Sequence, residues 1–317
     1  MPVTLSIVIN NYNYAHFLGQ AIESAIALEW SPKEVIVVDD GSTDNSKNVI
    51  LNFRDKIKYA FKENGGQASA FNKGFELATG DYVWFLDADD YIRPDSVRHL
   101  IKALSSSPEI CHFNFSTIRS DGSLIKNKAA NKFPSNYVDE KCISSTLKSW
   151  YPPTSANVFK MKLLQKIFPI PNVWRISADT FLILNSRMEG EYCFYNEAIV
   201  AYRIHEQNNF NLLVQKPDKQ RLSNIGWTMY RKYILTENLF YKNTKKRPPH
   251  PLMSPGELFN MLYLPKLNKD SPITCLEIMF LMLRFDKKEI FSNWKVILKF
   301  ALLLFLPLKF VKKVKSK

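Results

Sequence analysis

The sequence is poor in cysteine, and the few cysteines that it has are widely spaced. Only four occur, at positions 111, 142, 193 and 275, and no two of them form a Cys-x-x-Cys pair. This spacing favours neither a zinc site nor a disulfide framework. We therefore expect a protein of a reducing, cytosolic environment.

The sequence also lacks the features of an export signal. The N-terminal residues "MPVTLSIVINNYN" contain no basic segment, no long apolar run and no small-residue cleavage site. The apolar stretch Val296–Leu308 has only 13 residues and is interrupted by Lys299. As a helix it would extend about 20 Å, which is short of the roughly 30 Å of a bilayer core. We therefore expect it to lie on a membrane surface rather than to cross the membrane.

Positive charge is scarce in the first third of the chain, although the net charge is +13. Residues 1–104 carry 10 Lys and Arg against 14 Asp and Glu, residues 105–285 carry 24 against 14, and residues 286–317 carry 9 against 2. This distribution does not favour nucleic acid as a partner, since the excess is densest at the C-terminal end.

The C-terminal region combines apolar runs with lysines. Residues 273–285 and 296–308 are strongly apolar, and "KFVKKVKSK" follows them. Such segments are typical of amphipathic helices on an anionic membrane surface, where each lysine contributes about 1 kcal/mol. We expect a peripheral protein on the cytoplasmic face of the cell membrane; the alternative is a pair of helices packed on the domain.

Strand and helix patterns alternate through the first third, with short connections between them. This order predicts an α/β fold with a mainly parallel central sheet flanked by helices, followed by C-terminal amphipathic helices. The charge changes sign near residue 105, which favours three regions, 1–104, 105–240 and 241–317, although one continuous domain is an alternative. A hairpin is expected around Asp121-Gly122, and helices near residue 161 and from Asp179.

Three carboxylates occur within the four residues that follow the apolar run "YVWFL". Asp87 and Asp89 are two residues apart, so they point to the same side at the end of a predicted strand. Carboxylate oxygens are preferred ligands of Mg²⁺ and Mn²⁺, which often complete their shell with phosphate oxygens and water. The alternative is a solvated turn whose acids cap the next helix. Asp90 is expected to have a supporting role or to lie on the acceptor side.

A second strand ends in the same way, at "VIVVDDGSTD". Asp39 and Asp40 stand at its end, and a carboxylate there can accept a hydrogen bond from a nucleobase N–H or a ribose hydroxyl. Two acidic strand ends at one edge of a sheet favour a site for a nucleotide whose diphosphate is bridged by a metal.

Several motifs in this order resemble glycosyltransferase family 2, whose members are inverting enzymes with the GT-A fold. They are "SIVINNYNYAHFL", "VIVVDDGSTDNS", "ENGGQASAFNKGFELATGDYVWFLDADD" and "SADTF". The resemblance is close over residues 5–104 and extends thinly to about residue 210. It implies a metal-dependent enzyme that moves a sugar from a nucleoside diphosphate sugar, most often of UDP, to an acceptor hydroxyl.

The resemblance also implies roles for individual residues. Asp39 would pair with the base, Asp87 would face the ribose or sugar, and Asp89 would be the more direct ligand of Mn²⁺ or Mg²⁺. Donor contacts would further involve Tyr12, Asn13, Asp40, Gly66, Gln67 and Asn72. Two positions depart from the family, which often has Pro where Asn10 stands and Arg where Phe71 stands; the second departure removes a possible positive contact with the donor.

The downstream half would bind the acceptor and carry the base. Asp179 matches the family's base, and the acceptor hydroxyl needs one to take its proton; by pattern alone Asp179 is also an ordinary helix cap. His205 would lie by the metal or diphosphate, with a structural histidine as the alternative. Trp150 and Trp174 could stack on an acceptor sugar, or simply pack.

Two candidate roles follow for the whole chain. The first is transfer of a sugar to a glycan or lipid-linked acceptor in the synthesis of bacterial surface polysaccharide. The second is a non-catalytic protein that binds nucleotide sugars or acts as a scaffold. Asp179 separates them, because a protein that only binds the donor has no use for a base.

Overall fold

A computed structural model describes residues 3–127, 152–205 and 219–246, together with residues 258, 261, 273–275, 277 and 278. The chain divides into two compact units. Unit 1 comprises Met1–Tyr137 and Trp150–His205, and unit 2 comprises Val138–Ser149 and Glu206–Lys317. Every described residue of the candidate site belongs to unit 1.

The first third of the chain alternates strands and helices as its sequence predicts. Apolar residues at strand and helix spacings bury one face of each helix and almost all of the central strands. The elements are β1 (Leu5–Asn11), α1 (Ala15–Ala27), β2 (Lys33–Asp39), α2 (Ser46–Leu51), β3 (Lys58–Phe61), α3 (Gln67–Leu77), β4 (Tyr82–Asp87), β5 (Tyr91–Ile92) and α4 (Ser96–Leu104).

The elements that follow extend the same unit. The predicted hairpin forms around Gly122, whose φ of 85° suits glycine, and the predicted helices form near residue 161 and at Asp179. The elements are β6 (Ile110–Arg119), β7 (Leu124–Asn127), η1 (Thr154–Ala156), β8 (Asn157–Lys160), α6 (Met161–Leu164), η2 (Asn172–Trp174), α7 (Ala178–Glu189) and β9 (Tyr192–Ile204), and in unit 2 α8 (Lys219–Thr244).

One sheet runs through unit 1, with the strand order β3-β2-β1-β4-β8-β6-β9-β5 and β7 paired to β6. The neighbours β3, β2, β1 and β4 are all parallel, as are β6 and β9, whereas β8 is antiparallel to β4 and β6. The predicted α/β class with a parallel centre is confirmed. The sheet continues past residue 105, so the two predicted halves share it.

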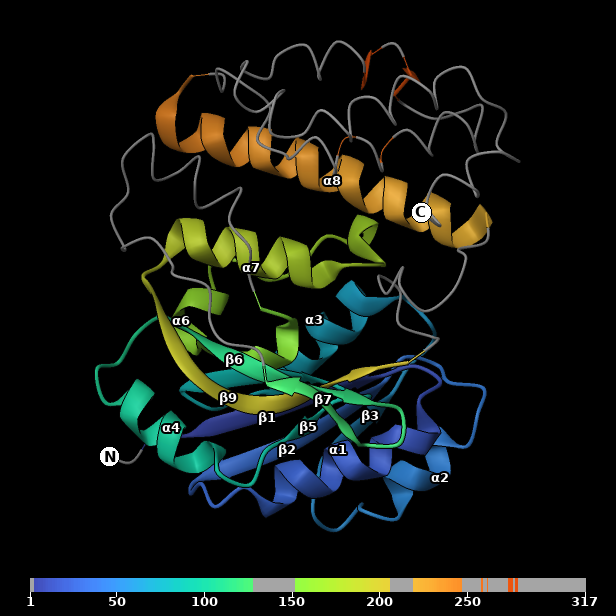
Figure 1. The fold of residues 1–317 in the computed structure, drawn as a ribbon, viewed down its shortest axis with the longest axis vertical. Coiled ribbons are helices and arrows are strands. Elements are labelled where there is room, and N and C mark those ends of the chain that lie inside the picture. The colour runs from blue at the N-terminus through green and yellow to red at the C-terminus, as the bar shows by residue number, and fades with distance from the viewer. Residues whose placement is uncertain are drawn as a thin grey trace. The chain divides into compact units, whose positions relative to one another are not determined.

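Helices cover both faces of the sheet (Figure 1). The helices α1 and α2 lie on one face, and α3, α6 and α7 lie on the other. The face under α1 forms the main apolar core, to which β1, β2, β4 and α4 contribute buried side chains. On the opposite face, α3 lies so close to β1 that a Cβ on Gly74 would come within 2.2 Å of Cγ1 of Val8.

The structure describes three of the four cysteines and little of the apolar C-terminal region. Cys111 and Cys193 are in register on neighbouring strands, and each carries a free thiol; Cys142 lies outside the described residues. Within the described residues no helix combines the length and apolarity needed to span a bilayer. The apolar C-terminal runs lie almost wholly outside them.

Candidate active site

The structure brings the two acidic strand ends to one edge of the sheet, on either side of β1. Asn11 of β1 is in register with Asp39 of β2, and Asn10 with Asp87 of β4. Because these strands are parallel, their carboxyl ends lie together, which is where open α/β sheets bind ligands.

Asp39 is buried and held by two donors of the protein. Its Oδ2 accepts a hydrogen bond from Nδ2 of Asn11 at 2.7 Å, and its Oδ1 accepts one from the backbone N–H of Ser42 at 2.9 Å. These bonds fix the orientation of the carboxylate. They leave further lone pairs for a ligand, since an ionised carboxylate has about four acceptor positions.

Tyr12 and Asn13 occupy the loop after β1. Asn13 has a positive φ of 60°, and its Oδ1 accepts a hydrogen bond from the backbone N–H of Thr43 at 2.7 Å. This bond joins the loop to the one that follows β2. Tyr12 is exposed, so its ring is available to stack on a ligand.

Asp40 follows β2 directly and has different partners from Asp39. Its Oδ1 accepts hydrogen bonds from Nζ of Lys62 at 2.5 Å and the N–H of Gly65 at 3.0 Å, and its Oδ2 accepts one from the N–H of Gly66 at 2.7 Å. The residue is only 3% exposed. Asp40 therefore braces the loop between β3 and α3.

The start of α3 contacts the segment that precedes α7. The backbone N–H of Gln67 donates to the carbonyl of Arg175 at 2.8 Å, and Oε1 of Gln67 accepts from the N–H of Ala178 at 2.8 Å. One turn later, the amide of Asn72 pairs with both backbone groups of Ile170, at 2.7 and 2.9 Å. Both side chains therefore bind backbone groups of this segment.

The residues after β4 form a turn that gathers three carboxylates. The N–H of Asp90 donates to the carbonyl of Asp87 at 3.0 Å. The hydroxyl of Ser155 accepts from the N–H of Asp87 at 3.0 Å and lies 3.4 Å from its Oδ2. Oδ2 of Asp89 lies 2.9 Å from Nε2 of His205, at the end of β9.

Burial and neighbouring carboxylates raise the pKa of two of these acids. Burial raises the pKa of Asp87 well above its usual value, and the charges of Asp89 and then Asp179 raise it further. Burial likewise raises the pKa of Asp90, with Asp89 and Asp87 adding to the effect. Oδ2 of Asp90 is shielded from solvent and has no hydrogen-bond partner among the described residues. This arrangement favours protonation or a bound cation.

Two phenols to which the sequence prediction assigned no role, Tyr14 and Tyr202, border the same cluster. Burial, followed by the nearby carboxylates, raises the pKa of Tyr14 and of Tyr202. Both therefore stay neutral at physiological pH and retain a proton to donate. The ring of Tyr14 meets that of His205 edge-on, with centroids 5.5 Å apart.

Arg203 is a further residue that the sequence prediction did not assign. Its backbone N–H donates to Oδ1 of Asp90 at 2.8 Å, and its Nε donates to the carbonyl of Asp89 at 2.8 Å. The guanidinium also lies over the ring of Phe17, at 4.5 Å. It is 2% exposed. An arginine inside the apolar run "AIVAYRI" was the available signal, because a buried guanidinium needs partners.

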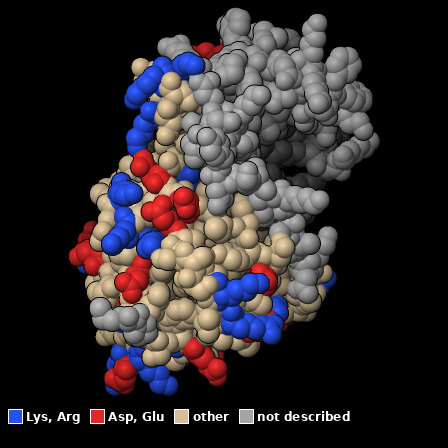
Figure 2. Space-filling view, turned by 90° about the vertical axis from the view of Figure 1, so that its left-hand side faces the viewer, with Lys and Arg blue, Asp and Glu red and all other residues tan. Residues whose placement is uncertain are grey.

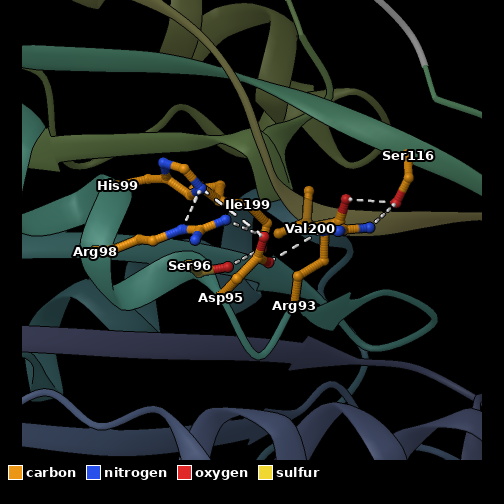
Figure 3. Close-up of polar contacts among 8 residues, drawn as sticks. All are labelled: Arg93, Asp95, Ser96, Arg98, His99, Ser116, Ile199 and Val200. Carbon is orange, nitrogen blue, oxygen red and sulfur yellow. Dashed lines mark hydrogen bonds and ion pairs between the residues drawn. The ribbon is translucent and has the colours of Figure 1, made fainter.

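The segment after this turn is fixed to β9 as well (Figure 3). The backbone N–H and the side chain of Arg93 contact the carbonyl of Ile199 and the hydroxyl of Ser116, at 2.9 and 3.3 Å. The hydroxyl of Ser96, at the start of α4, donates to the same carbonyl at 2.6 Å. These bonds hold β9, and with it Arg203, against the turn.

Asp179 lies in the first turn of α7, on the same side of the sheet as α3. Its charge raises the pKa of Asp87, so the two carboxylates are within electrostatic reach of each other. Burial raises the pKa of Asp179 itself. Its Oδ1 is shielded from solvent without a hydrogen-bond partner among the described residues, and a carboxylate in that state is a ready proton acceptor.

Of the two tryptophans expected on the acceptor side, the structure describes only Trp174. Trp174 is 4% exposed and packs on Phe181, with ring centroids 5.7 Å apart. The packing alternative therefore describes this residue. Trp150 lies outside the described residues.

The donor set around Asp89 fits a divalent cation. Oδ2 of Asp89 and Nε2 of His205 lie 2.9 Å apart, at hydrogen-bond distance; a carboxylate oxygen and an imidazole nitrogen are also atoms of the kinds that transition-metal ions bind. Within the described residues, no group of three or more His, Cys, Asp or Glu side chains could hold a metal by itself. Asp89 and His205 are thus residues that could hold a metal, and in this structure their side chains contact each other.

Known proteins resemble this chain over most of its length. The family model described as "Glycosyl transferase family 2" matches residues 6–168. A glycosyltransferase of Nostoc sp. is 35% identical over 263 residues, which cover 76% of this chain and 82% of that protein. Chondroitin synthase of Pasteurella multocida is 26% identical over 75% of this chain, but the match covers only 26% of that longer protein.

Solved structures share the fold. TarS of S. aureus, residues 1–349, superposes with a TM-score of 0.53 at 15% identity, covering 89% of this chain and 88% of that chain. The full TarS structure gives 0.52 and covers 92% of this chain and 54% of that chain. With its strand-end acids, its family match and its GT-A architecture, the chain belongs to glycosyltransferase family 2 and is a glycosyltransferase.

Proposed function

We propose that this glycosyltransferase moves a sugar from a UDP-sugar to an acceptor hydroxyl with inversion at the anomeric carbon. The observation that carries the proposal is that Oδ1 of Asp179, in the first turn of α7, is shielded from solvent and has no hydrogen-bond partner among the described residues, while the charge of Asp179 raises the pKa of Asp87 at the end of β4. A donor held at the strand ends would thereby present its sugar near a buried carboxylate.

Asp179 acts as the base in this proposal. Its carboxylate takes the proton of the acceptor hydroxyl as the acceptor oxygen attacks the anomeric carbon and the bond to the diphosphate breaks. Because burial raises the pKa of Asp179, the group is a stronger base than an exposed carboxylate. Transfer should accordingly decline as the pH falls through that raised pKa, since the protonated acid cannot accept a proton.

The donor would lie along the ends of β1, β2 and β4. Asp39 is oriented to accept from the base, Tyr12 offers an exposed ring, and Asp87 faces the ribose or sugar. The choice of UDP is supported by the TarS structures of similar fold, which include complexes of that protein with UDP and with UDP-GlcNAc. Asp40, Gln67 and Asn72 would support the loops around the donor.

Asp89 and His205 would hold Mn²⁺ or Mg²⁺, with Asp87 nearby. A cation there supplies positive charge to the departing diphosphate. It would also compensate the carboxylates whose crowding is described above. Oxygen atoms of the diphosphate and water would complete its shell.

The Asp89→Ala variant tests the metal assignment. Removing one of the two adjacent ligands should abolish the dependence of UDP binding on Mn²⁺, which can be measured by calorimetry with and without the ion. Wild-type protein treated with a chelator is the matched control and should bind UDP as weakly as the variant. Full Mn²⁺ dependence in Asp89→Ala would contradict the assignment.

The acceptor in this proposal is a lipid-linked glycan used for bacterial surface polysaccharide, handled at the cytoplasmic face of the membrane. Support comes from the apolar, lysine-rich residues 273–317, which suit an anionic membrane surface. The C-terminal region would thus bring the active site to a substrate that is itself anchored in lipid.

A panel of nucleotide sugars separates this function from donor binding alone. Each donor is incubated with the protein and Mn²⁺, and both thermal stabilisation and release of free sugar are measured. An enzyme should be stabilised by its donor and should slowly hydrolyse it in the absence of acceptor. Stabilisation without hydrolysis or transfer for any donor would favour the alternative, a binding or scaffolding protein.

A further inference from the structure

We propose that Gln67 is a positioning residue for Asp179, and that Asp40 holds the loop from which Gln67 acts. This inference rests on the proposed role of Asp179 as the base. It departs from the resemblance, which implies donor contacts for both Gln67 and Asp40. In this proposal both residues instead fix the position of the first turn of α7.

The start of α7 depends on a group from another helix. Ser177, which precedes α7, has a left-handed backbone with φ 61° and does not cap the helix with its own side chain. Oε1 of Gln67 instead accepts the N–H of Ala178 at 2.8 Å. Such N–H groups at the start of a helix have no partner within the helix. Gln67 thus caps α7 from α3, one residue before Asp179.

Asp40 and Arg175 both hold the residues at which the glycine loop enters α3. Asp40 accepts the N–H groups of Gly65 and Gly66 at 3.0 and 2.7 Å. Gly66, with φ 84°, lies so close to Arg175 that a Cβ on it would come within 2.6 Å of the carbonyl oxygen of Arg175. The N–H of Gln67 donates to that same oxygen at 2.8 Å.

A second contact from the same loop reinforces the connection. Nη2 of Arg175 donates to Oδ1 of Asn64 at 2.9 Å. The contacts therefore form a continuous chain from the buried carboxylate of Asp40, through the glycine loop, to the residues that begin α7. A catalytic carboxylate must be held within a fraction of an ångström, and a displacement of about 1 Å can lower the rate on the order of a hundredfold.

The first test replaces Gln67 by Met, which has a similar length but cannot accept the N–H of Ala178. We expect kcat to fall on the order of tenfold to a hundredfold, while the Kd for the UDP-sugar donor stays within about twofold of wild type. Gln67→Glu keeps an acceptor at a helix N-terminus, where negative charge is favoured. It should restore most of kcat at the alkaline plateau of the pH profile.

Tyr82→Phe is the matched control. It also removes one buried hydrogen bond to a backbone group, from the phenol of Tyr82 to the carbonyl of Pro108 at 2.8 Å, but at the opposite end of β4. Its kcat should be that of wild type. Equal loss of kcat in Gln67→Met and Tyr82→Phe would overturn the proposal, as would an equal loss of kcat and donor affinity in Gln67→Met.

A double mutant tests whether Gln67 acts through Asp179. If it does, adding Gln67→Met to Asp179→Asn should cause no further loss of transfer, because the group being positioned is already gone. Losses that multiply would overturn the inference and leave the proposed function standing. Full transfer by Asp179→Asn alone would instead overturn the proposed base, and the inference with it.

Discussion

The carboxylates of the active site differ in how the protein compensates their charge. Asp39 and Asp40 each accept hydrogen bonds from neighbouring donors, including Lys62 in the case of Asp40. Asp90 has one such bond, from the N–H of Arg203, and a second oxygen without a partner among the described residues. Because burial and two acidic neighbours raise the pKa of Asp90, its ionised form destabilises the free protein.

Asp90→Asn should therefore stabilise the protein at pH 8 in metal-free buffer. A group whose pKa is raised by folding contributes stability at low pH, and that stability is lost as the pH rises through the raised pKa. Asn keeps an acceptor for the N–H of Arg203 without the charge. We expect a free energy of unfolding higher than that of wild type by on the order of 1 kcal/mol at pH 8, and a vanishing difference near about pH 4.

Urea unfolding at the two pH values measures this difference. Asp81→Asn is a control for which the change in stability has the opposite sign. Hydrogen bonds from Thr4 lower the pKa of Asp81, so this substitution should make the protein less stable than wild type at pH 8. Wild type keeps the stability from Asp81 above the usual carboxyl range and loses it as the pH falls through the lowered pKa. An Asp90→Asn variant less stable than wild type at pH 8 would contradict this prediction, because it would show that the surrounding protein stabilises the ionised carboxylate of Asp90.

At the scale of elements, the packing of α3 on β1 sets the position of the glycine loop and of Gln67. A Cβ on Gly74 would lie 2.2 Å from Cγ1 of Val8, so no larger residue fits while the helix stays in place. Glycine inside a helix is otherwise unfavourable. Its presence here reflects the close approach of the helix to the side chain of Val8.

Gly74→Ala should lower the free energy of unfolding by about 1–3 kcal/mol, as overpacking does. Gly19→Ala is the matched control, since Gly19 also lies within a helix but its Cβ would meet only Cγ1 of Val49, at 3.9 Å. That change should raise the free energy of unfolding by about 0.5–1 kcal/mol. Equal effects of the two substitutions in urea unfolding would contradict this packing argument.

The elements of the first third could be predicted from the sequence because their information is local. Apolar spacing locates β1, α1, β2 and β4, and the acids at the ends of β2 and β4 follow directly from their place after apolar runs. The partners of these acids could not be predicted in the same way. Asp40 meets Gly66 across 26 residues, and Arg203 reaches the carbonyl of Asp89 across 114. The position of β8 between β4 and β6 in the sheet could not be predicted either, because β8 pairs with strands that are distant from it in the sequence.

At the scale of the whole molecule, the net charge of +13 is unevenly distributed along the chain. Figure 2 shows Lys and Arg side chains and Asp and Glu side chains in several small separate groups on the described part of one face. The densest excess of lysine belongs to the C-terminal residues, beside the apolar runs. This distribution supports the proposal of a membrane surface as partner rather than nucleic acid.

Truncation before Ile273 should move the protein from the membrane fraction to the soluble fraction of cell lysates. In the full-length chain, replacing the lysines at 312, 313, 315 and 317 by Gln should weaken binding to anionic vesicles, by about 1 kcal/mol for each lysine near the surface. Vesicles of neutral lipid serve as the control for the electrostatic part. A truncated protein that still sediments with membranes would place the anchor elsewhere.

The central claim is that Asp179 serves as the base in sugar transfer from a nucleoside diphosphate donor. The most direct measurement compares wild type and Asp179→Asn for donor affinity, by calorimetry, and for transfer, with a radiolabelled UDP-sugar. We predict a donor Kd within about twofold of wild type, and transfer reduced by on the order of a hundredfold or more. Transfer at the wild-type rate, or a loss of donor affinity as large as the loss of transfer, would contradict this role.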